Sequence, residues 1–234
     1  MDLQICVGCG TRFAPPVVAP DGPVLVCAAC GHRQPFRRLP LFSLTGPSGT
    51  GKSTVARLLA DELDGLAVVV EQDVLWTAGL QDPADDFGRF RSTWLRMAAM
   101  IHQSGRPVVL VGTVVPAQLE CRPERVFVGD VHYLALVCDS EVLAPRLLAR
   151  PAWRGWDEER VAETLEFNDW LRRSAEALDP PVELLDTTTR PLEETVGAVA
   201  DWVRARLPRG DPEDVGDVLP AHAPARPHPG PRSS

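Results

Sequence analysis

The chain has 234 residues, of which 44% are hydrophobic, so it is long enough for one substantial folded domain with some length left over. Its formal net charge of -8 argues against a broad nucleic-acid-binding face, which would need a basic surface. The first residues lack an apolar signal-peptide core, and the longest apolar runs, such as GLAVVV at 65–70, are far too short to span a membrane. We therefore expect a cytoplasmic protein in a reducing compartment.

Two cysteine pairs mark residues 1–38, in the pattern C-x2-C-x17-C-x2-C. Cys6 and Cys9 form the first pair, Cys27 and Cys30 form the second, and a glycine that relieves a tight turn follows each pair. In a reducing compartment this spacing predicts a zinc site with four thiolate ligands. So short a segment buries little core, and the metal would supply its folding free energy. The segment resembles a zinc ribbon, which either contacts nucleic acid or protein or only caps the next domain.

Residues 39–207 alternate short apolar runs with amphipathic stretches. Apolar residues recur at helical spacing in three stretches. The first follows residue 52 and ends at Gly65, the second starts at about Asp157, and the third starts at Pro191. Five apolar runs predict strands: 41–45, 66–70, 107–111, 133–138 and 182–186. This alternation predicts an α/β fold with a mostly parallel five-stranded sheet covered on both faces. Ligands of such sheets lie beyond the carboxyl ends of the strands.

The run GPSGTGKS at 46–53 fits the phosphate-loop pattern G-x-x-x-x-G-K-[ST], between a predicted strand and a predicted helix. Its backbone N–H groups would converge on the phosphates of ATP, with Lys52 at the outer phosphates and the Ser53 hydroxyl as a magnesium ligand. Lys52 is also the only lysine among 24 basic residues, which indicates a working site because the loop needs a compact charge. The predicted ATP-binding residues are Gly46, Pro47, Ser48, Gly49, Thr50, Gly51, Lys52, Ser53 and Thr54.

Two acidic residues follow the second predicted strand, in VEQDVLW at 70–76. Glu71 or Asp73 could orient an acceptor hydroxyl and take its proton, or hold magnesium through water. The alternative is a pair of solvated acids at a strand end. Residues 77–105 would supply an acceptor pocket, with Arg89, Arg91 and Trp94 as candidates for binding an anionic or aromatic substrate. The alternative for these three is an ordinary helix with a surface side and a core side.

A stretch rich in arginine and tryptophan follows the fourth predicted strand, at 138–161. Arg150 and Arg154 lie in it, and arginines on a mobile segment can close over a transferring phosphate and stabilise its charge. We call residues 138–161 the lid. Residues 208–234 are rich in proline and poor in large apolar residues, which predicts a disordered tail.

Residues 40–207 resemble the P-loop small-molecule kinases, the group that phosphorylates nucleosides, nucleotides, gluconate, shikimate and chloramphenicol. The resemblance rests on GPSGTGKST, EQD after strand two, RLLARPAWR in the lid, and LLDTTTRPLEETVGAVADWV near the end. It implies a three-layer P-loop NTPase sandwich and a phosphate loop at Gly46 to Thr54. It also implies that Asp73, or alternatively Glu71, contacts the acceptor and that Arg150 and Arg154 act from the lid. Thr187 to Arg190 would lie near the adenine base of ATP. The implied activity is transfer of the γ-phosphate of ATP to a small molecule, namely a nucleoside, a nucleotide or a similar metabolite.

One position departs from the pattern of many nucleotide kinases and P-loop ATPases, which carry an aspartate at the end of strand three. Val111 and Gly112 stand there instead. The missing acid weakens a motor or AAA-type interpretation, since those proteins use it to hold magnesium and position water. It suits a kinase whose acid lies after strand two. The alternative function is a nucleotide-dependent binding module or ATPase whose ribbon engages RNA or a protein.

Overall fold

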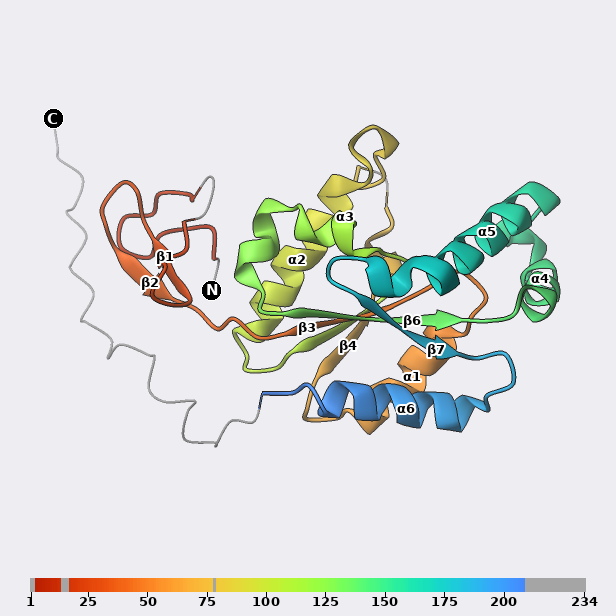
Figure 1. Cartoon of the computed structure of the whole chain (residues 1–234). Coiled ribbons are helices and arrows are strands. Elements are labelled where there is room, and N and C mark those ends of the chain that lie inside the picture. The colour runs from red at the N-terminus through yellow and green to blue at the C-terminus, as the bar shows by residue number, and fades with distance from the viewer. Residues whose placement is uncertain (1–2, 14–16, 78, 209–234) are drawn as a thin grey trace, which may run out of the picture.

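Five parallel strands form the centre of the structure, a computed structural model that describes residues 3–13, 17–77 and 79–208 (Figure 1). The strands are β3 (Leu41–Thr45), β4 (Val68–Glu71), β5 (Val108–Val111), β6 (Val131–Val137) and β7 (Val182–Asp186), in the order β4-β5-β3-β6-β7. The predicted five-stranded parallel sheet is confirmed, with strand bounds within two residues of the predicted ones. The tail predicted at 208–234 lies outside the described residues except for its first.

Helices cover both faces of this sheet and make three layers (Figure 1). α1 (Lys52–Glu62) and α6 (Leu192–Arg204) pack on one face. α2 (Gly88–His102), α3 (Pro116–Glu120) and α5 (Glu158–Ser174) pack on the other, while α4 (Ser140–Leu148) lies beyond the carboxyl ends of the strands. The short 3-10 turns are η1 (Gln72–Leu75), η2 (Pro83–Asp85), η3 (Pro123–Phe127), η4 (Ala152–Arg154) and η5 (Ala175–Ala177). Pro191 precedes α6 as its N-cap, one position earlier than predicted.

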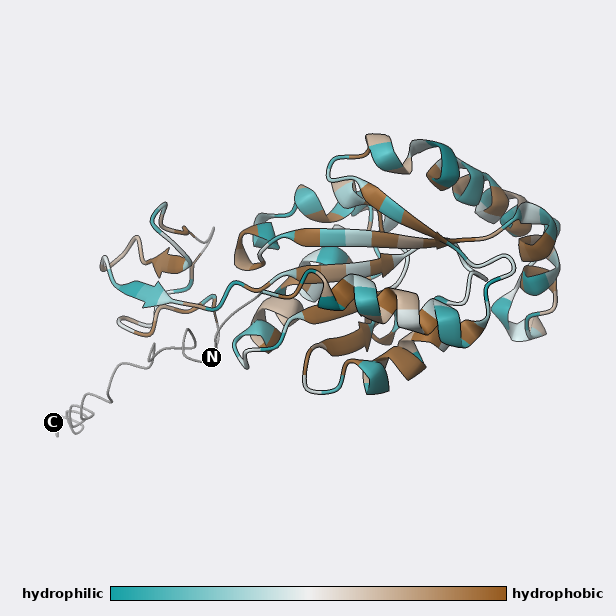
Figure 2. Cartoon of the chain, turned by 60° about the horizontal axis from the view of Figure 1, so that its bottom comes forward, coloured by the Kyte–Doolittle hydropathy of each residue, from teal (hydrophilic) through white to brown (hydrophobic). Residues whose placement is uncertain are grey.

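The central strand β3 is buried along its whole length because both faces of the sheet are covered. Phe42 and Leu44 enter the core under α1 and α6, whereas Leu41 enters the core under α2 and α5. Figure 2 shows the strands as mostly hydrophobic ribbons between helices of mixed character. Within the described part of the chain, no helix is both long and apolar enough to cross a membrane.

The N-terminal segment folds around its four cysteines, and its buried residues join the hydrophobic cluster under α2 and α5. Its strands β1 (Val24–Val26) and β2 (Arg33–Pro35) pair antiparallel. In the two cysteine turns, the Gly10 N–H donates to the Cys6 carbonyl and the Gly31 N–H donates to the Cys27 carbonyl, each at 2.8 Å. Both glycines have positive φ, 74° and 71°, which a side chain would strain. The glycine after each pair is therefore part of the turn, as the sequence predicted.

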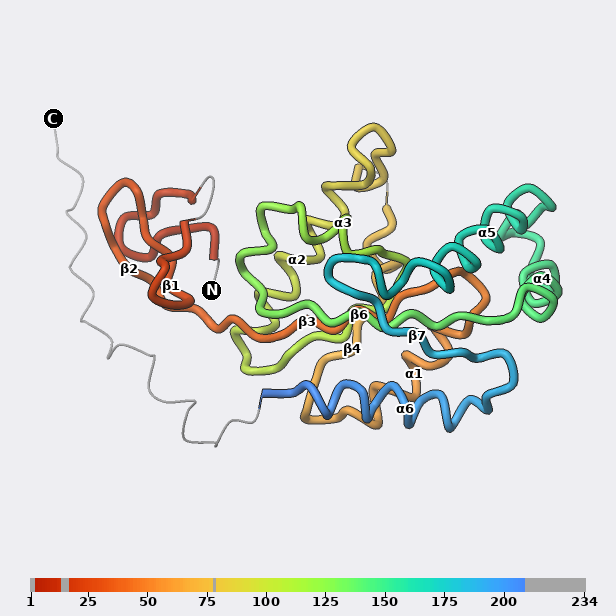
Figure 3. The backbone as a smooth tube through the Cα atoms, in the orientation of Figure 1, coloured from red at the N-terminus to blue at the C-terminus, as the bar shows by residue number. Residues whose placement is uncertain are grey.

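This unit, which we call the ribbon, lies against the amino-terminal side of the sheet. The Phe36 and Phe127 rings meet edge to face with centroids 6.2 Å apart. The Gln103 side chain accepts from the Arg37 N–H and donates to the Arg37 carbonyl, both at 2.9 Å. Figure 3 shows the chain running from the ribbon along β3 toward the lid at the opposite end of the sheet. The ribbon and the lid are therefore separated by the length of the sheet.

Candidate functional site

The predicted phosphate loop connects the carboxyl end of β3 to the amino end of α1, as expected. Gly46, Gly49 and Gly51 have φ values of 123°, 87° and 96°. A Cβ at Gly46 would lie 2.3 Å from the Leu136 carbonyl oxygen, so no side chain fits there. The glycines thus let the loop bend tightly at the start of a helix, where free N–H groups can bind phosphate oxygens.

Lys52 folds back over this loop. Its Nζ donates to the carbonyls of Gly46 and Pro47, both at 2.7 Å. Burial lowers the pKa of Lys52 to about 7, against the opposing effect of the Asp73 and Glu71 carboxylates. A bound polyphosphate would favour the charged ammonium, so the loop is built to gain from an anionic ligand.

Hydroxyl side chains that follow two other strands, β5 and β7, support the loop. Thr187 Oγ1 donates to the carbonyls of Val137 (3.0 Å) and Thr50 (3.3 Å), and Thr113 Oγ1 donates to the Gly46 carbonyl at 3.0 Å. Thr187, which the resemblance placed near the adenine base of ATP, is thus buried beneath the loop. Its role in the structure is to hold the loop backbone.

Two cavities meet at the carboxyl ends of the strands. The smaller, of about 120 Å³, lies over the phosphate loop and is lined by Lys52, Ser53 and Thr54 among others. The larger, of about 720 Å³, opens between η1, the start of α2 and the lid. The residues that line both are Ser48, Asp73, Thr113, Arg150 and Arg154. Four of the predicted site residues, Ser48, Asp73, Arg150 and Arg154, therefore stand where the two cavities join.

The two candidate acids take different positions. Asp73 is exposed on η1 and lines both cavities. Glu71 ends β4 and lines only the smaller cavity, on the phosphate side. The sequence left the choice between them open, and the structure gives only Asp73 access to both spaces.

The place after β5, where the sequence lacks an acid, is filled by another side chain. A Cβ at Gly112 would lie 1.9 Å from Gln72 Cδ, so Gln72 occupies that space. Its amide donates to the Thr113 carbonyl at 3.2 Å, and Trp94 Nε1 donates to the Gln72 carbonyl at 3.1 Å. The sequence offered no signal for this role of Gln72, because the contact joins residues far apart in the chain.

Lid arginines rest on tryptophan rings. The Arg150 guanidinium lies 5.3 Å from the Trp156 ring centroid, and that of Arg154 lies 4.8 Å from the Trp153 ring centroid. Such contacts hold a guanidinium near its place while leaving its N–H groups free for an anion. Arg150 and Arg154 line the cavity over the phosphate loop, and their role toward a transferring phosphate stays a prediction.

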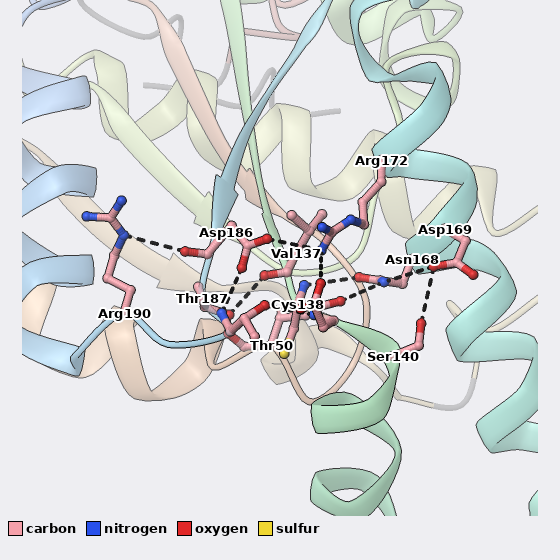
Figure 4. Close-up of polar contacts among 12 residues, drawn as sticks. Thr50, Val137, Cys138, Ser140, Asn168, Asp169, Arg172, Asp186, Thr187 and Arg190 are labelled. Atoms are coloured by element: carbon pink, nitrogen blue, oxygen red, sulfur yellow. Dashed lines mark hydrogen bonds and ion pairs between the residues drawn. The ribbon is translucent and has the colours of Figure 1, made fainter.

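Helix α5 anchors the lid to the sheet (Figure 4). The buried Asn168 side chain accepts from the Cys138 N–H at 3.2 Å and donates to the Cys138 carbonyl at 2.8 Å. Arg172 pairs with Asp139 (3.1 Å) and Asp186 (3.0 Å), which joins the first residues of the lid to the end of β7. The sequence placed Asn168 on a helix but did not indicate this anchoring role.

The residues predicted for the acceptor pocket divide between cavity, core and surface. Arg91 lines the larger cavity and is 8% exposed. Trp94 lies in the core at 2% exposure, and Arg89 is exposed and lines neither cavity. The alternative interpretation, a helix with a core and a surface side, is therefore right for Trp94 and Arg89.

The four cysteines of the ribbon converge as predicted. Their Sγ atoms all lie within 4.8 Å of one another, and the pairs Cys6–Cys30 and Cys9–Cys27 are 3.7 Å apart. Tetrahedral zinc with Zn–S bonds of about 2.3 Å requires Sγ atoms about 3.8 Å apart, whereas a disulfide requires about 2.05 Å. The Cys9 Sγ also donates to the Thr11 hydroxyl oxygen at 3.3 Å. The donor set fits zinc.

Comparison with known proteins supports the fold seen here. Residues 43–166, more than half of the chain, match the AAA domain family. A relative from Archaeoglobus fulgidus named "Putative adenylate kinase" is 29% identical over 173 residues, which cover 70% of this chain and 82% of that protein. The crystal structure of a sugar kinase from Janibacter sp. HTCC2649 superposes with a TM-score of 0.53 at 19% identity, over 73% of this chain and 95% of that one. This likeness establishes a P-loop, kinase-like fold.

The missing acid after β5 does not place the chain outside the AAA domain family, since the matched residues include both the phosphate loop and the end of β5. That the missing acid weakens a motor or AAA-type function stays a prediction. Gln72 fills the vacant place after β5, so the fold is complete without an acid there.

Proposed function

The chain belongs to the AAA domain family, and on that premise we propose that it is an ATP-dependent phosphotransferase. Its acceptor is a small molecule, namely a nucleoside, a nucleotide or a similar metabolite. One observation carries the proposal. Asp73, Arg150 and Arg154 line both the phosphate-loop cavity and the larger cavity. An acid and two cations therefore lie between the proposed site of ATP and the proposed site of the phosphate acceptor.

In this reaction an acceptor oxygen in the larger cavity forms a bond to the γ-phosphorus of ATP, and the bond from that phosphorus to the bridging oxygen of ADP breaks. Asp73 orients an acceptor hydroxyl and takes its proton. Arg150 and Arg154 stabilise the charge on the transferring phosphoryl group, and Lys52 holds the outer phosphates. Glu71, which faces only the phosphate side, is better placed to act through a metal-bound water than as the base.

Magnesium would be held by the Ser53 hydroxyl, which lines the phosphate-loop cavity beside Thr54. It would neutralise charge on the β- and γ-phosphates when bound. The four ribbon cysteines would hold zinc, and a reducing cytoplasm would keep their thiols available for it. The ribbon lies at the opposite end of the sheet, so we assign its zinc no part in phosphoryl transfer.

The test is a phosphotransfer assay with zinc-loaded protein and a panel of nucleosides, nucleotides, sugars, sugar acids and amino alcohols. We expect ADP release that depends on one class of acceptor. ADP release at background with every acceptor would contradict the proposal. The alternative, a nucleotide-dependent binding module, predicts ATP-dependent retention of RNA that is lost in the variant Cys6→Ser.

The variant Asp73→Asn tests the base. Loss of a positioned general base costs about 10²–10⁴-fold in rate, so we expect turnover to fall in this range while ATP affinity stays within about twofold. Glu71→Gln is the matched control on the neighbouring acid. If Glu71→Gln abolishes turnover and Asp73→Asn does not, the role of the base moves to Glu71.

A further inference from the structure

Resting on the proposed function, we infer that Gln72 is the positioning residue for Asp73. Its side chain ties the turn η1 to the segment beside the phosphate loop, so that the Asp73 carboxylate stays where the two cavities join. Gln72 lines the larger cavity and not the phosphate-loop cavity. It therefore acts on the transfer through the proposed base and not through the phosphates.

Gln72 is held from two sides. Its backbone carbonyl accepts from Trp94 Nε1 at 3.1 Å, and the Trp94 side chain belongs to the core. Its side-chain Nε2 donates to the Thr113 carbonyl at 3.2 Å. Gln72 is only 9% exposed, and a polar side chain buried to this extent needs such partners. The first residue of η1 is therefore joined both to α2 and to the segment that follows β5.

Gly112 leaves the room that this contact needs. A Cβ at Gly112 would lie 1.9 Å from Gln72 Cδ, so a larger residue would push the amide away from the Thr113 carbonyl. The Gln72 amide is the far end of a flexible side chain and can move aside without disturbing the backbone. The glycine after β5 and the glutamine after β4 are therefore needed together for the anchor, although the chain can fold without it.

Thr113 continues the contact to the phosphate loop. Its Oγ1 donates to the Gly46 carbonyl at 3.0 Å, and the same carbonyl accepts from Lys52 Nζ at 2.7 Å. Two hydrogen bonds of one residue thus connect the start of η1 with the first residue of the loop. The separation between η1 and the phosphate loop depends on the bond from Gln72 to Thr113.

Asp73 has few contacts of its own to hold it in place. It is exposed, and within the described part of the chain its carboxylate makes no hydrogen bond or ion pair, although its charge acts on Lys52. Its backbone carbonyl accepts from the Trp76 N–H at 2.9 Å inside η1. A carboxylate without an orienting partner depends on the backbone that carries it, and a misplacement of about 1 Å can cost about 10²-fold in rate. Gln72 fixes that backbone one residue earlier.

The test combines kinetics with a measurement that needs no turnover. Gln72→Met keeps the length of the side chain and removes its hydrogen-bond donor. With the acceptor found in the panel assay, we expect kcat to fall about 10²-fold, while the Kd of a non-hydrolysable ATP analogue with magnesium stays within about twofold. Amide exchange should become faster in 72–76 and stay unchanged in the phosphate loop at 46–54. Unchanged exchange in 72–76 overturns the inference.

A double-mutant cycle shows whether Gln72 acts through Asp73. In the background of Asp73→Asn, Gln72→Met should lower the residual kcat by less than about twofold, because the group that it positions is gone. A merely structural role, or a direct contact of Gln72 with the acceptor, would lower kcat by the same factor in both backgrounds. That result overturns the inference.

Two further variants separate the anchor from a general loss of stability. Gly112→Ala displaces the same amide without changing Gln72 and should reproduce the fall in kcat, so it carries the test if Gln72→Met does not fold. Gln103→Met is the matched control, because Gln103 makes hydrogen bonds with Arg37 and the Ala99 carbonyl at the amino end of the sheet. Its loss should lower the stability and leave kcat within about twofold. Full kcat in Gly112→Ala, or an equal fall in Gln103→Met, overturns the inference.

The outcomes also separate this inference from the proposed function. If no acceptor causes ADP release, but 72–76 exchanges faster in Gln72→Met and not in Gln103→Met, phosphotransfer is wrong and the anchoring of η1 stands. If ADP release occurs and Gln72→Met has the kcat of the unchanged protein, the inference is wrong and the phosphotransferase stands.

Discussion

The two ends of the parallel sheet are built on different principles. At the amino end, the ribbon gathers four cysteines whose Sγ atoms lie within 4.8 Å, in a fold with two three-residue strands. At the carboxyl end, a glycine-rich loop, an acid and several arginines face open cavities. The thiols of the ribbon lie close to one another, whereas the polar side chains at the carboxyl end line space that a ligand can fill.

This difference indicates which end carries structure and which carries chemistry. Four thiolates around one tetrahedral metal leave no open coordination position, as in structural zinc sites. Lys52 in the phosphate loop, by contrast, has a pKa that burial lowers to about 7, although the Asp73 and Glu71 carboxylates oppose the shift. Groups with perturbed pKa values are typical of ligand sites. The comparison can be tested at each end separately.

The largest effect is expected from Cys6→Ser at the ribbon. Structural zinc supplies about 10 kcal/mol or more to small domains of this kind, so loss of a ligand should unfold the ribbon. Zinc content by mass spectrometry should fall below one per chain, and amide exchange in 17–36 should become fast. ATP affinity should stay within about twofold because the phosphate loop lies at the other end of the sheet.

Cys121→Ser is the control, since Cys121 lies outside the cysteine cluster. A Cys6→Ser protein that still binds zinc one to one would contradict the assignment of the site. Loss of ATP binding in step with zinc would instead show that the two ends are coupled, and the comparison would fail.

A smaller effect is expected from Asn168→Ala, which removes the anchor of the lid. The variant leaves the Cys138 N–H and carbonyl buried without partners, at a cost of about 2–4 kcal/mol in the free energy of unfolding. Urea unfolding measures this loss, and limited proteolysis should cut first within the lid.

Thr164→Ala is the matched control on the same helix, because Thr164 Oγ1 bonds the Arg160 carbonyl at the surface. It should change stability by less than about 0.5 kcal/mol. Equal stabilities of the two variants would show that Asn168 does not anchor the lid.

The smallest effect is the pH dependence of ATP binding. The pKa of Lys52 is lowered to about 7 in the free protein, and bound phosphates would raise it. Binding then takes up a proton above pH 7, so affinity falls as the pH rises, by at most about tenfold per unit between pH 7 and 9. Titration calorimetry in buffers of different ionisation enthalpy measures the proton uptake. Lys52→Arg keeps its charge and should abolish the uptake, and an uptake that persists in this variant would assign the proton to another group.

Local patterns allowed much of the fold to be predicted. The five strands follow from short apolar runs, the phosphate loop from its glycines and lysine, and the ribbon from its cysteine spacing. The support that Thr187 gives the loop could not be predicted in this way, because its hydroxyl binds backbone atoms of Val137 and Thr50, which lie far away in the sequence. For Trp94 the sequence left the pocket and the core open, and the structure places its ring in the core. Both outcomes depend on surroundings that come from distant segments.

The sequence by itself determined the loop that can hold a triphosphate and the cysteine turns that can hold zinc, because each motif needs only neighbouring backbone and a few residues at fixed spacing. The tertiary structure decided that Asp73, and not Glu71, reaches both cavities. It also decided that Arg91 lines the larger cavity whereas Trp94, on the same helix, lies in the core. Which side chain reaches a cavity depends on every segment packed around it, and that is settled only when the sheet, α2 and the lid come together.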